Sequence, residues 1–166
     1  LPLEAPQASL AAQPPALTQG AFGSRPSVAL VQARASALTG GLLQGYRQGD
    51  LGWITAFAGR LAGLGPGLTP AGDDWLAGWL VGLRAAAAMD GSDPLLPLEV
   101  VSRAVIGSAR SRTSRLSLAF LQAAADGAVA EPWHALLAAL VDADPTPLRQ
   151  AAAEIMRHGA TSGSDM

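Results

Sequence analysis

The sequence predicts an all-α protein, a single helical domain of roughly six or seven helices around a central buried helix. Three observations lead to this prediction. Apolar residues make up 49% of the 166 positions, and most of them are alanine and leucine, which favour helices. Residues typical of strands are few, since aromatics contribute only 5% and valine, isoleucine and threonine are sparse. Short clusters of Gly, Pro, Asp and Ser interrupt the chain, as loops between helices do.

The first residues are not expected to pack. Residues 1–23 carry four prolines among small residues, which is typical of an extended or disordered leader. Residues 24–166 are the expected helical domain. The chain opens at Leu1 and stops at Met166 directly after a motif-like segment, so we expect a piece of a longer protein.

Helix signals follow one another through the domain. A first helix is predicted over 28–46 with a weak point at Gly40-Gly41, and a second over 50–62 with an aspartate as its N-cap. A third, over 72–89, is apolar on every side, which predicts a helix enclosed by others. Capping residues and prolines predict the remaining helices over 97–109, 116–125, 131–141 and 145–158.

The loop before the third helix is the first candidate site. Residues 63–72 contain four glycines and two prolines, so the chain cannot continue as a helix there. Backbone N–H groups at a helix N-terminus can hold an anion, which the helix dipole also favours. We expect Gly65, Gly67 and Gly72 to cradle a phosphate or carboxylate, with Thr69 adding a hydroxyl.

Asp73 and Asp74 follow in the first turn of that helix and are the candidate catalytic carboxylates. The pair could hold a divalent cation, for which Mg²⁺ is the candidate. In the alternative, one of them simply caps the helix. Two carboxylates and a phosphate within one turn would repel one another strongly, so either a cation bridges them or one aspartate points away.

The end of the chain repeats this pattern. Residues 159–166 align without gaps on 67–74, and both segments contain a glycine, a threonine, small residues and an aspartate. Two such loops could meet at one pocket, although chance similarity is the alternative. His158, at the end of the preceding helix, is a candidate general acid or anion contact. The expected ligand-binding residues of this second loop are Thr161, Ser162, Gly163, Ser164 and Asp165.

Four arginines, at positions 103, 110, 112 and 115, are the only cationic cluster. Arg112 and Arg115 flank Thr113-Ser114 at a predicted helix start. A guanidinium beside a helix N-terminus suits two-point binding of carboxylate or phosphate. We therefore place Arg112, Thr113 and Arg115 in the ligand site, with a solvated cationic face as the alternative.

Three of these segments resemble the AllH family: Gly65–Gly78 (GPGLTPAGDDWLAG), Thr113–Ser117 (TSRLS) and the final segment 158–166 (HGATSGSDM). The resemblance covers about residues 51–166. It implies a subunit of oxamate carbamoyltransferase in allantoin degradation, an enzyme that converts oxalurate and phosphate to oxamate and carbamoyl phosphate. In that setting the two aspartates would position the carbamoyl amide. Two alternatives stay open: a non-catalytic or regulatory module that binds a small carboxylate or phosphate, and a helical assembly subunit.

Composition excludes several function classes. All eleven cations are arginine, so no lysine can form a Schiff base, and the net charge of −2 gives no reason to expect nucleic acid. Without cysteine there is no disulfide, thiolate nucleophile or cysteine-ligated metal. No apolar run approaches the roughly 20 residues that a membrane span needs. We expect a cytoplasmic protein whose partners are a small anionic metabolite and other enzyme subunits.

Overall fold

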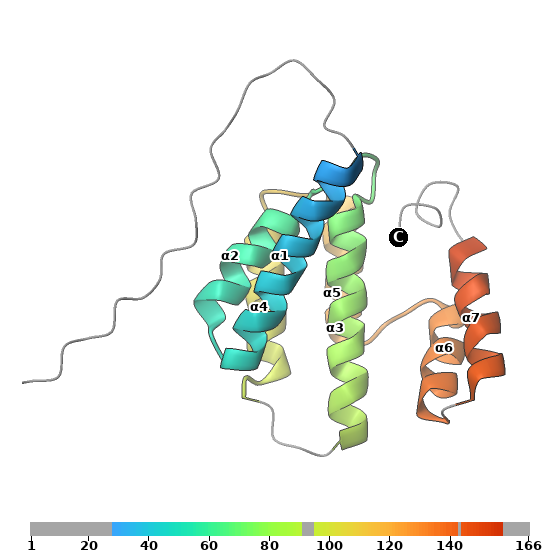
Figure 1. Ribbon diagram of the computed structural model, residues 1–166. Helices are drawn as coiled ribbons and strands as arrows, with labels where there is room; N and C mark the ends of the chain where they lie inside the picture. Colours follow the sequence, from blue (N-terminus) through green and yellow to red (C-terminus); the bar gives the residue numbers. More distant parts are fainter. Residues whose placement is uncertain (1–27, 91–94, 143, 158–166) are drawn as a thin grey trace, which may run out of the picture.

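The computed structural model describes residues 28–90, 95–142 and 144–157 (Figure 1). These residues form helices and no strand, which confirms the all-α class. The described helices end within two residues of the predicted positions; the expected leader, residues 1–23, lies outside the described residues. In chain order the helices are α1 (Val28–Gln48), α2 (Leu51–Leu61), α3 (Ala71–Asp90), α4 (Leu98–Ala109), α5 (Arg115–Asp126), α6 (Glu131–Val141) and α7 (Pro145–Arg157).

Helix α1 runs unbroken through Gly40-Gly41, where the sequence predicts a weak point. The reason is its packing on α2. A Cβ on Gly41 would lie 2.4 Å from the Phe57 ring, and one on Gly45 would lie 2.8 Å from the Cβ of Trp53. The two glycines therefore let the helices approach closely, and this packing outweighs the low helix propensity of glycine, about 1 kcal/mol per residue.

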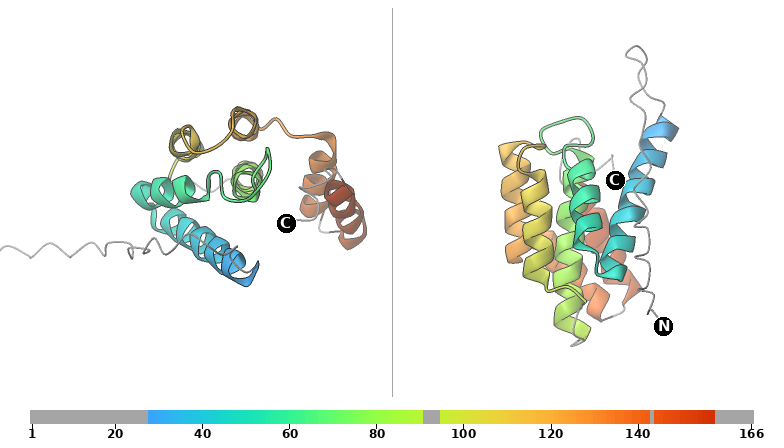
Figure 2. Two further views of the ribbon diagram at one scale, coloured as in Figure 1. Left: turned by 90° about the horizontal axis from the view of Figure 1, so that it is seen from above. Right: turned by 90° about the vertical axis from the view of Figure 1, so that its left-hand side faces the viewer.

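Helices α1 to α5 form a bundle with one apolar core (Figures 1 and 2). Helix α3 packs mainly on α5 and also touches α2 and α4. Trp79 of α3 meets Tyr46 of α1 edge to face, with 5.7 Å between ring centroids, and stacks on Trp75 one turn earlier. The largest fully buried apolar side chains of this core are Leu42, Ile54, Leu61, Leu76, Leu80, Val101, Val105 and Leu121.

The expected enclosure of α3 on all sides is not found. The helix is buried at Leu76, Leu80 and Val81, whereas most residues from Gly82 to Met89 are exposed. The reason is length. Helix α3 has 20 residues while α4 and α5 have 12 each, so its C-terminal turns extend past its neighbours (Figure 1).

Helices α6 and α7 form a hairpin beside this bundle (Figure 2). The two helices pack mainly on each other, and Ala139 and Ala151 are their buried side chains. Trp133 and Leu137 of α6 also pack against the core of the bundle. Because α6 and α7 bury so little, a cleft remains between the hairpin and α3.

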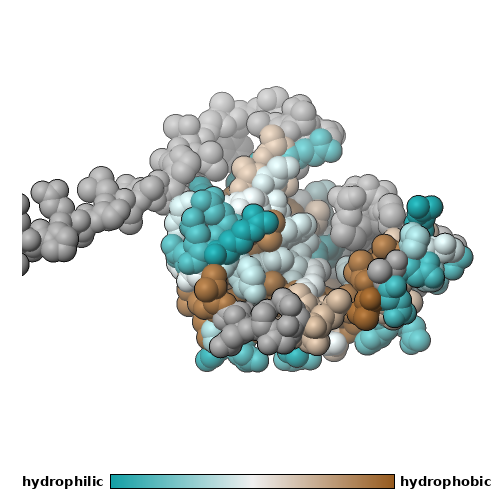
Figure 3. Space-filling model, turned by 60° about the horizontal axis from the view of Figure 1, so that its bottom comes forward, coloured by the Kyte–Doolittle hydropathy of each residue, from teal (hydrophilic) through white to brown (hydrophobic). Residues whose placement is uncertain are grey.

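The surface at the lower end of the molecule is mixed in polarity. Met89, Leu95, Leu140 and Val141 are large apolar side chains that are exposed. Seen from this end, apolar surface occurs in separate groups among polar side chains (Figure 3). Within the described residues, no helix combines the length and the apolar character needed to cross a bilayer.

Candidate functional site

The glycine loop connects α2 to α3 through backbone conformations that glycine adopts readily. Gly63, Gly65 and Gly67 have φ angles of 73°, 117° and 97°, in the region that favours glycine. Leu68 at the tip is 76% exposed, and Thr69 is half-buried. The expected loop is therefore confirmed, and its shape depends on these three glycines.

Hydroxyl groups at the N-terminus of α5 hold this loop in place. The Ser114 hydroxyl donates to the Leu68 carbonyl at 2.9 Å, and the Ser117 hydroxyl donates to the same oxygen at 3.2 Å. Ser114 is also the N-cap of α5, since its Oγ accepts from the Ser117 N–H at 3.0 Å. The Gly-rich segment and the TSRLS segment, 46 residues apart in the chain, are thus in direct contact.

Asp73 anchors the other end of the loop. The side chain is only 2% exposed, and its Oδ1 accepts from the Gly63 N–H at 2.9 Å. Its Oδ2 accepts a hydrogen bond from the Thr113 hydroxyl. We call these three residues, Gly63, Asp73 and Thr113, the Asp73 junction. It ties α3, the glycine loop and the α4–α5 turn together, so both oxygens of Asp73 are used inside the fold.

Close backbone contacts surround the junction. A Cβ on Gly63 would lie 2.2 Å from the Arg112 carbonyl oxygen, and one on Gly72 would lie 2.1 Å from the Leu61 carbonyl oxygen. The Gly72 N–H donates to the Leu64 carbonyl at 2.8 Å. The N–H group that Gly72 was expected to offer to a ligand is thus bonded within the loop, and a ligand role for Gly72 stays a prediction. The structural role of Gly63 was missed, although its position at the end of a helix is the usual signal for such a glycine.

Two expected donors do remain available. Within the described residues, the N–H groups of Gly65 and Gly67 have no hydrogen-bond partner. A Cβ on Gly67 would meet nothing within 4 Å, so this part of the loop faces open space. The loop can thus offer two backbone donors to a ligand, next to the N-terminus of α3.

Asp74 faces a different environment from Asp73. It lies in a cleft of about 280 Å³ between α3 and α5 on one side and the α6–α7 hairpin on the other. Val81, Phe120, Trp133 and Ile155 contribute apolar walls. We call this space the Asp74 cleft. Burial, and to a lesser degree the neighbouring charge of Asp73, raises the pKa of the Asp74 carboxyl above its usual value.

The two candidate arginines do not line the Asp74 cleft. Arg112 and Arg115 are both exposed, and the Arg112 guanidinium lies beside Gly59 of α2. Arg115 occupies the first turn of α5, directly after the Ser114 that holds the loop. Thr113 is the member of this segment that the structure brings to the aspartates, through its bond to Asp73.

The second loop lies outside the described residues, from His158 to the end of the chain. The helix before it is described. Ile155 of α7 lines the Asp74 cleft, and His158 follows three residues later in the chain. The C-terminal end of α7 and the N-terminus of α3 lie at the same end of the molecule (Figure 1).

No metal centre is apparent in the part of the chain that the structure describes. There, no three His, Cys, Asp or Glu side chains gather closely enough to hold a metal ion. Because both oxygens of Asp73 are bonded within the junction, Asp74 is the carboxylate of the pair that faces the cleft.

Comparison with known proteins identifies the family. A family model described as oxamate carbamoyltransferase subunit AllH matches residues 61–166, well over half of the chain. The chain belongs to the AllH family. The matched range includes the glycine loop, the Asp73 junction, the lining residues of the Asp74 cleft and the final segment. No curated protein and no solved structure matches the chain.

Proposed function

We propose that this chain is a subunit of an oxamate carbamoyltransferase and that it binds a small anionic substrate at the Asp74 cleft and the adjoining glycine loop. The observation that supports this most is the family match over residues 61–166. Its description as a subunit also supports other enzyme subunits as partners. The meeting of the Gly-rich and TSRLS segments at the start of α3 supports a site at that end of the bundle.

The transfer of a carbamoyl group from oxalurate to phosphate breaks one bond, forms another and moves one proton. The bond between the carbamoyl carbon of oxalurate and the nitrogen that leaves with oxamate must break, and a bond from that carbon to a phosphate oxygen must form. The hydrogen phosphate proton ends on the leaving nitrogen. Both substrates are anions, so the site must supply donors that offset their repulsion, and donors for the oxygen that gains negative charge in the transition state.

The described residues can supply hydrogen-bond donors for anion binding and a carboxyl for the carbamoyl group. The unpaired N–H groups of Gly65 and Gly67 would bind phosphate or carboxylate oxygens, with Thr69 adding a hydroxyl. The carboxyl of Asp74 would contact the carbamoyl amide. Burial and the neighbouring Asp73 raise the pKa of this carboxyl, so the site holds its proton more tightly than water would.

The second loop completes the proposed site. Ile155 supports a position near the cleft for the segment that follows α7. In this proposal His158 contacts the anion or delivers a proton, and Thr161 and Ser162 add hydroxyl donors. Arg115, next to the Ser114 that binds the loop, supplies positive charge to the approaching anion, whereas Asp73 positions the loop.

A binding screen tests this proposal. We expect oxalurate, oxamate, carbamoyl phosphate or phosphate to raise the melting temperature of the protein, each measured with and without Mg²⁺ and with nucleotides as negative controls. Thr69→Ala and Thr161→Ala should each reduce that shift. If none of these anions changes the melting temperature, or if both threonine variants respond as the wild type does, the two-loop site is wrong.

The variant Asp74→Asn distinguishes a catalytic subunit from a module that only binds the anion. In the assembled enzyme we expect this variant to lose turnover while it retains anion binding, since the amide keeps the size of the carboxyl but cannot exchange a proton. Asp142→Asn, at an exposed aspartate after α6, is the matched control and should keep full activity. Unchanged turnover in Asp74→Asn would contradict the role of this carboxyl in the reaction.

A further inference from the structure

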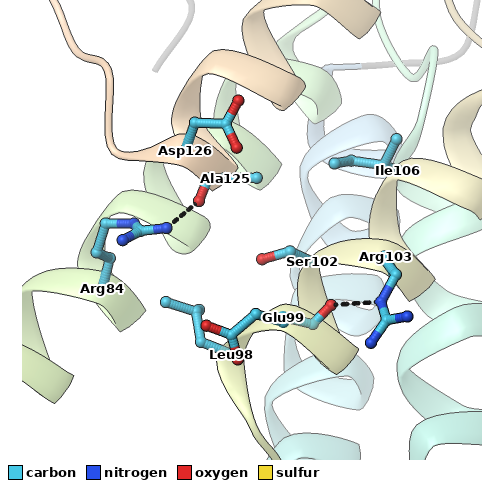
Figure 4. Close-up of a pocket in the computed structure, with 8 residues that line it drawn as sticks. All are labelled: Arg84, Leu98, Glu99, Ser102, Arg103, Ile106, Ala125 and Asp126. Atoms are coloured by element: carbon cyan, nitrogen blue, oxygen red, sulfur yellow. Dashed lines mark hydrogen bonds between the residues drawn. The ribbon is translucent and has the colours of Figure 1, made fainter.

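A second pocket lies on the bundle away from the Asp74 cleft and shares no lining residue with it. Its volume is about 420 Å³, and helices α3, α4 and α5 surround it (Figure 4). We call it the Ser102 pocket. The residues that matter for its chemistry are Arg84 of α3, Leu98, Glu99, Ser102 and Ile106 of α4, and Ala125 of α5.

The hydroxyl of Ser102 has no hydrogen-bond partner among the described residues, although the residue is only 7% exposed. A serine within a helix can satisfy its hydroxyl at a backbone carbonyl of the preceding turn. Ser108 on the same helix does so, donating to Val105 at 2.8 Å. Figure 4 shows the Ser102 oxygen directed into the pocket, on the side that faces Arg84. A buried, unpaired hydroxyl destabilises the fold, so a ligand that bonds to it removes that penalty.

Arg84 is held in position across the pocket. One of its terminal nitrogens donates to the Ala125 carbonyl near the end of α5. Gly127, with a φ of 82°, ends that helix, and a Cβ there would lie 2.8 Å from the Arg84 Cδ. The absence of a side chain at Gly127 thus makes room for Arg84. The other N–H groups of the guanidinium have no partner in the described part of the chain, so they can bind a ligand.

The charges around the pocket balance. Arg84 and Arg103 stand against Glu99 and Asp126, and no ion pair joins any of these four within the described residues. Arg103 bonds instead to the Glu99 carbonyl, with its guanidinium turned away from Ser102, and the Asp126 carboxylate also points away (Figure 4). A polyanion such as a nucleotide is disfavoured by this balance, whereas a ligand with one negative and one positive end matches it.

We propose that the Ser102 pocket binds a free α-amino acid. Its carboxylate accepts hydrogen bonds from the Ser102 hydroxyl and from the unused N–H groups of Arg84. Its ammonium group donates to the Glu99 carboxylate, which lies one helical turn from Ser102 on the same face of α4. An apolar side chain packs against Leu98 and Ile106.

Calorimetry and thermal shift with single L-amino acids test this inference. L-Alanine, L-valine, L-leucine and L-glutamine are the first probes, with acetate and methylammonium as controls that carry only one of the two charges. We expect at least one of the amino acids to bind and both controls to fail. If none of the common L-amino acids binds to the wild-type protein, the proposal is overturned.

Three variants then locate the binding site. Ser102→Ala should weaken binding by about 5- to 10-fold while the melting temperature without ligand stays equal or rises, since a buried unpaired hydroxyl is removed. Arg84→Met should weaken binding by about tenfold or more. Ser108→Ala is the matched control, because its hydroxyl is already bonded, and it should bind as the wild type does. Unchanged affinity in Ser102→Ala would contradict the proposal.

The outcome is independent of the carbamoyltransferase proposal. Asp74→Asn alters the Asp74 cleft alone and should leave amino acid binding unchanged. Loss of amino acid binding in that variant would mean that the ligand occupies the cleft, and it would overturn the assignment to the Ser102 pocket.

Discussion

The Asp73 junction and the Asp74 cleft are built from consecutive residues, yet they have opposite designs. Successive side chains on a helix point about 100° apart, so the two carboxylates leave α3 in different directions. One enters a closed junction where backbone and hydroxyl donors bind both of its oxygens. The other enters a partly open cleft with apolar walls, where burial works against its charge. One helical turn can thus both fix a loop and present a carboxyl to the cleft beside it.

The largest loss of stability is expected for a substitution at Gly72, where two backbone segments lie in close contact next to the Asp73 junction. Gly72→Ala would place a Cβ 2.1 Å from the Leu61 carbonyl oxygen, and neither backbone can move without disturbing the loop. We expect the free energy of unfolding to fall by about 4 kcal/mol or more, measured by chemical denaturation. Gly82→Ala, at an open position of the same helix, is the control and should stabilise by about 0.5–1 kcal/mol. Equal stabilities for the two variants would contradict the close packing at Gly72.

The junction itself is tested at Asp73. Asp73→Ala leaves the Gly63 N–H and the Thr113 hydroxyl without their acceptor, and we expect a loss of about 3 kcal/mol in the free energy of unfolding. Asp73→Asn keeps one acceptor oxygen and should lose about 1 kcal/mol. If both variants retain wild-type stability, Asp73 does not hold the loop, and a role in catalysis would regain support.

The smallest change in stability is expected for a substitution in the Asp74 cleft, and there we expect a gain rather than a loss. Folding raises the pKa of Asp74, so the folded state holds this proton more tightly than the unfolded state does. Asp74 therefore destabilises the folded protein least below its unfolded pKa, near 3.8. The destabilisation grows as pH rises through the pKa that Asp74 has in the folded protein. Asp74→Asn should slightly raise the melting temperature at pH 7 and leave it unchanged near pH 3. A lower melting temperature at pH 7 would contradict this direction.

Much of the fold could be predicted because its signals are local. Prolines, glycines and capping residues mark the helix ends, and Ser114 and Gly127 bound α5 as such residues usually do. The weak point predicted at Gly40-Gly41 does not end the helix, because contacts with another helix act there as well. Gly41 makes room for the Phe57 ring of α2, a contact that a single sequence does not display.

The candidate site could be predicted only in part. The glycine loop and the two aspartates stand out by composition, but the sequence offers no means to assign different roles to Asp73 and Asp74. That distinction depends on Thr113, which is 40 residues away in the chain. No sequence motif indicates the Ser102 pocket. Its residues come from three helices and include residue types that are common on protein surfaces. The roles predicted for residues 158–166 stay predictions.

The α6–α7 hairpin has a mechanical consequence. Its helices pack mainly on each other and join α5 through residues 127–130, so a rotation of the hairpin as one body would bend that short connection. Such a rotation would change the width of the Asp74 cleft, and it would also shift Trp133 and Leu137, which pack against the core of α1 to α5. A partner subunit that binds the hairpin and changes its orientation would then change the affinity of the cleft for its ligand. Control of this site could therefore come from outside the chain, without any change at the glycine loop.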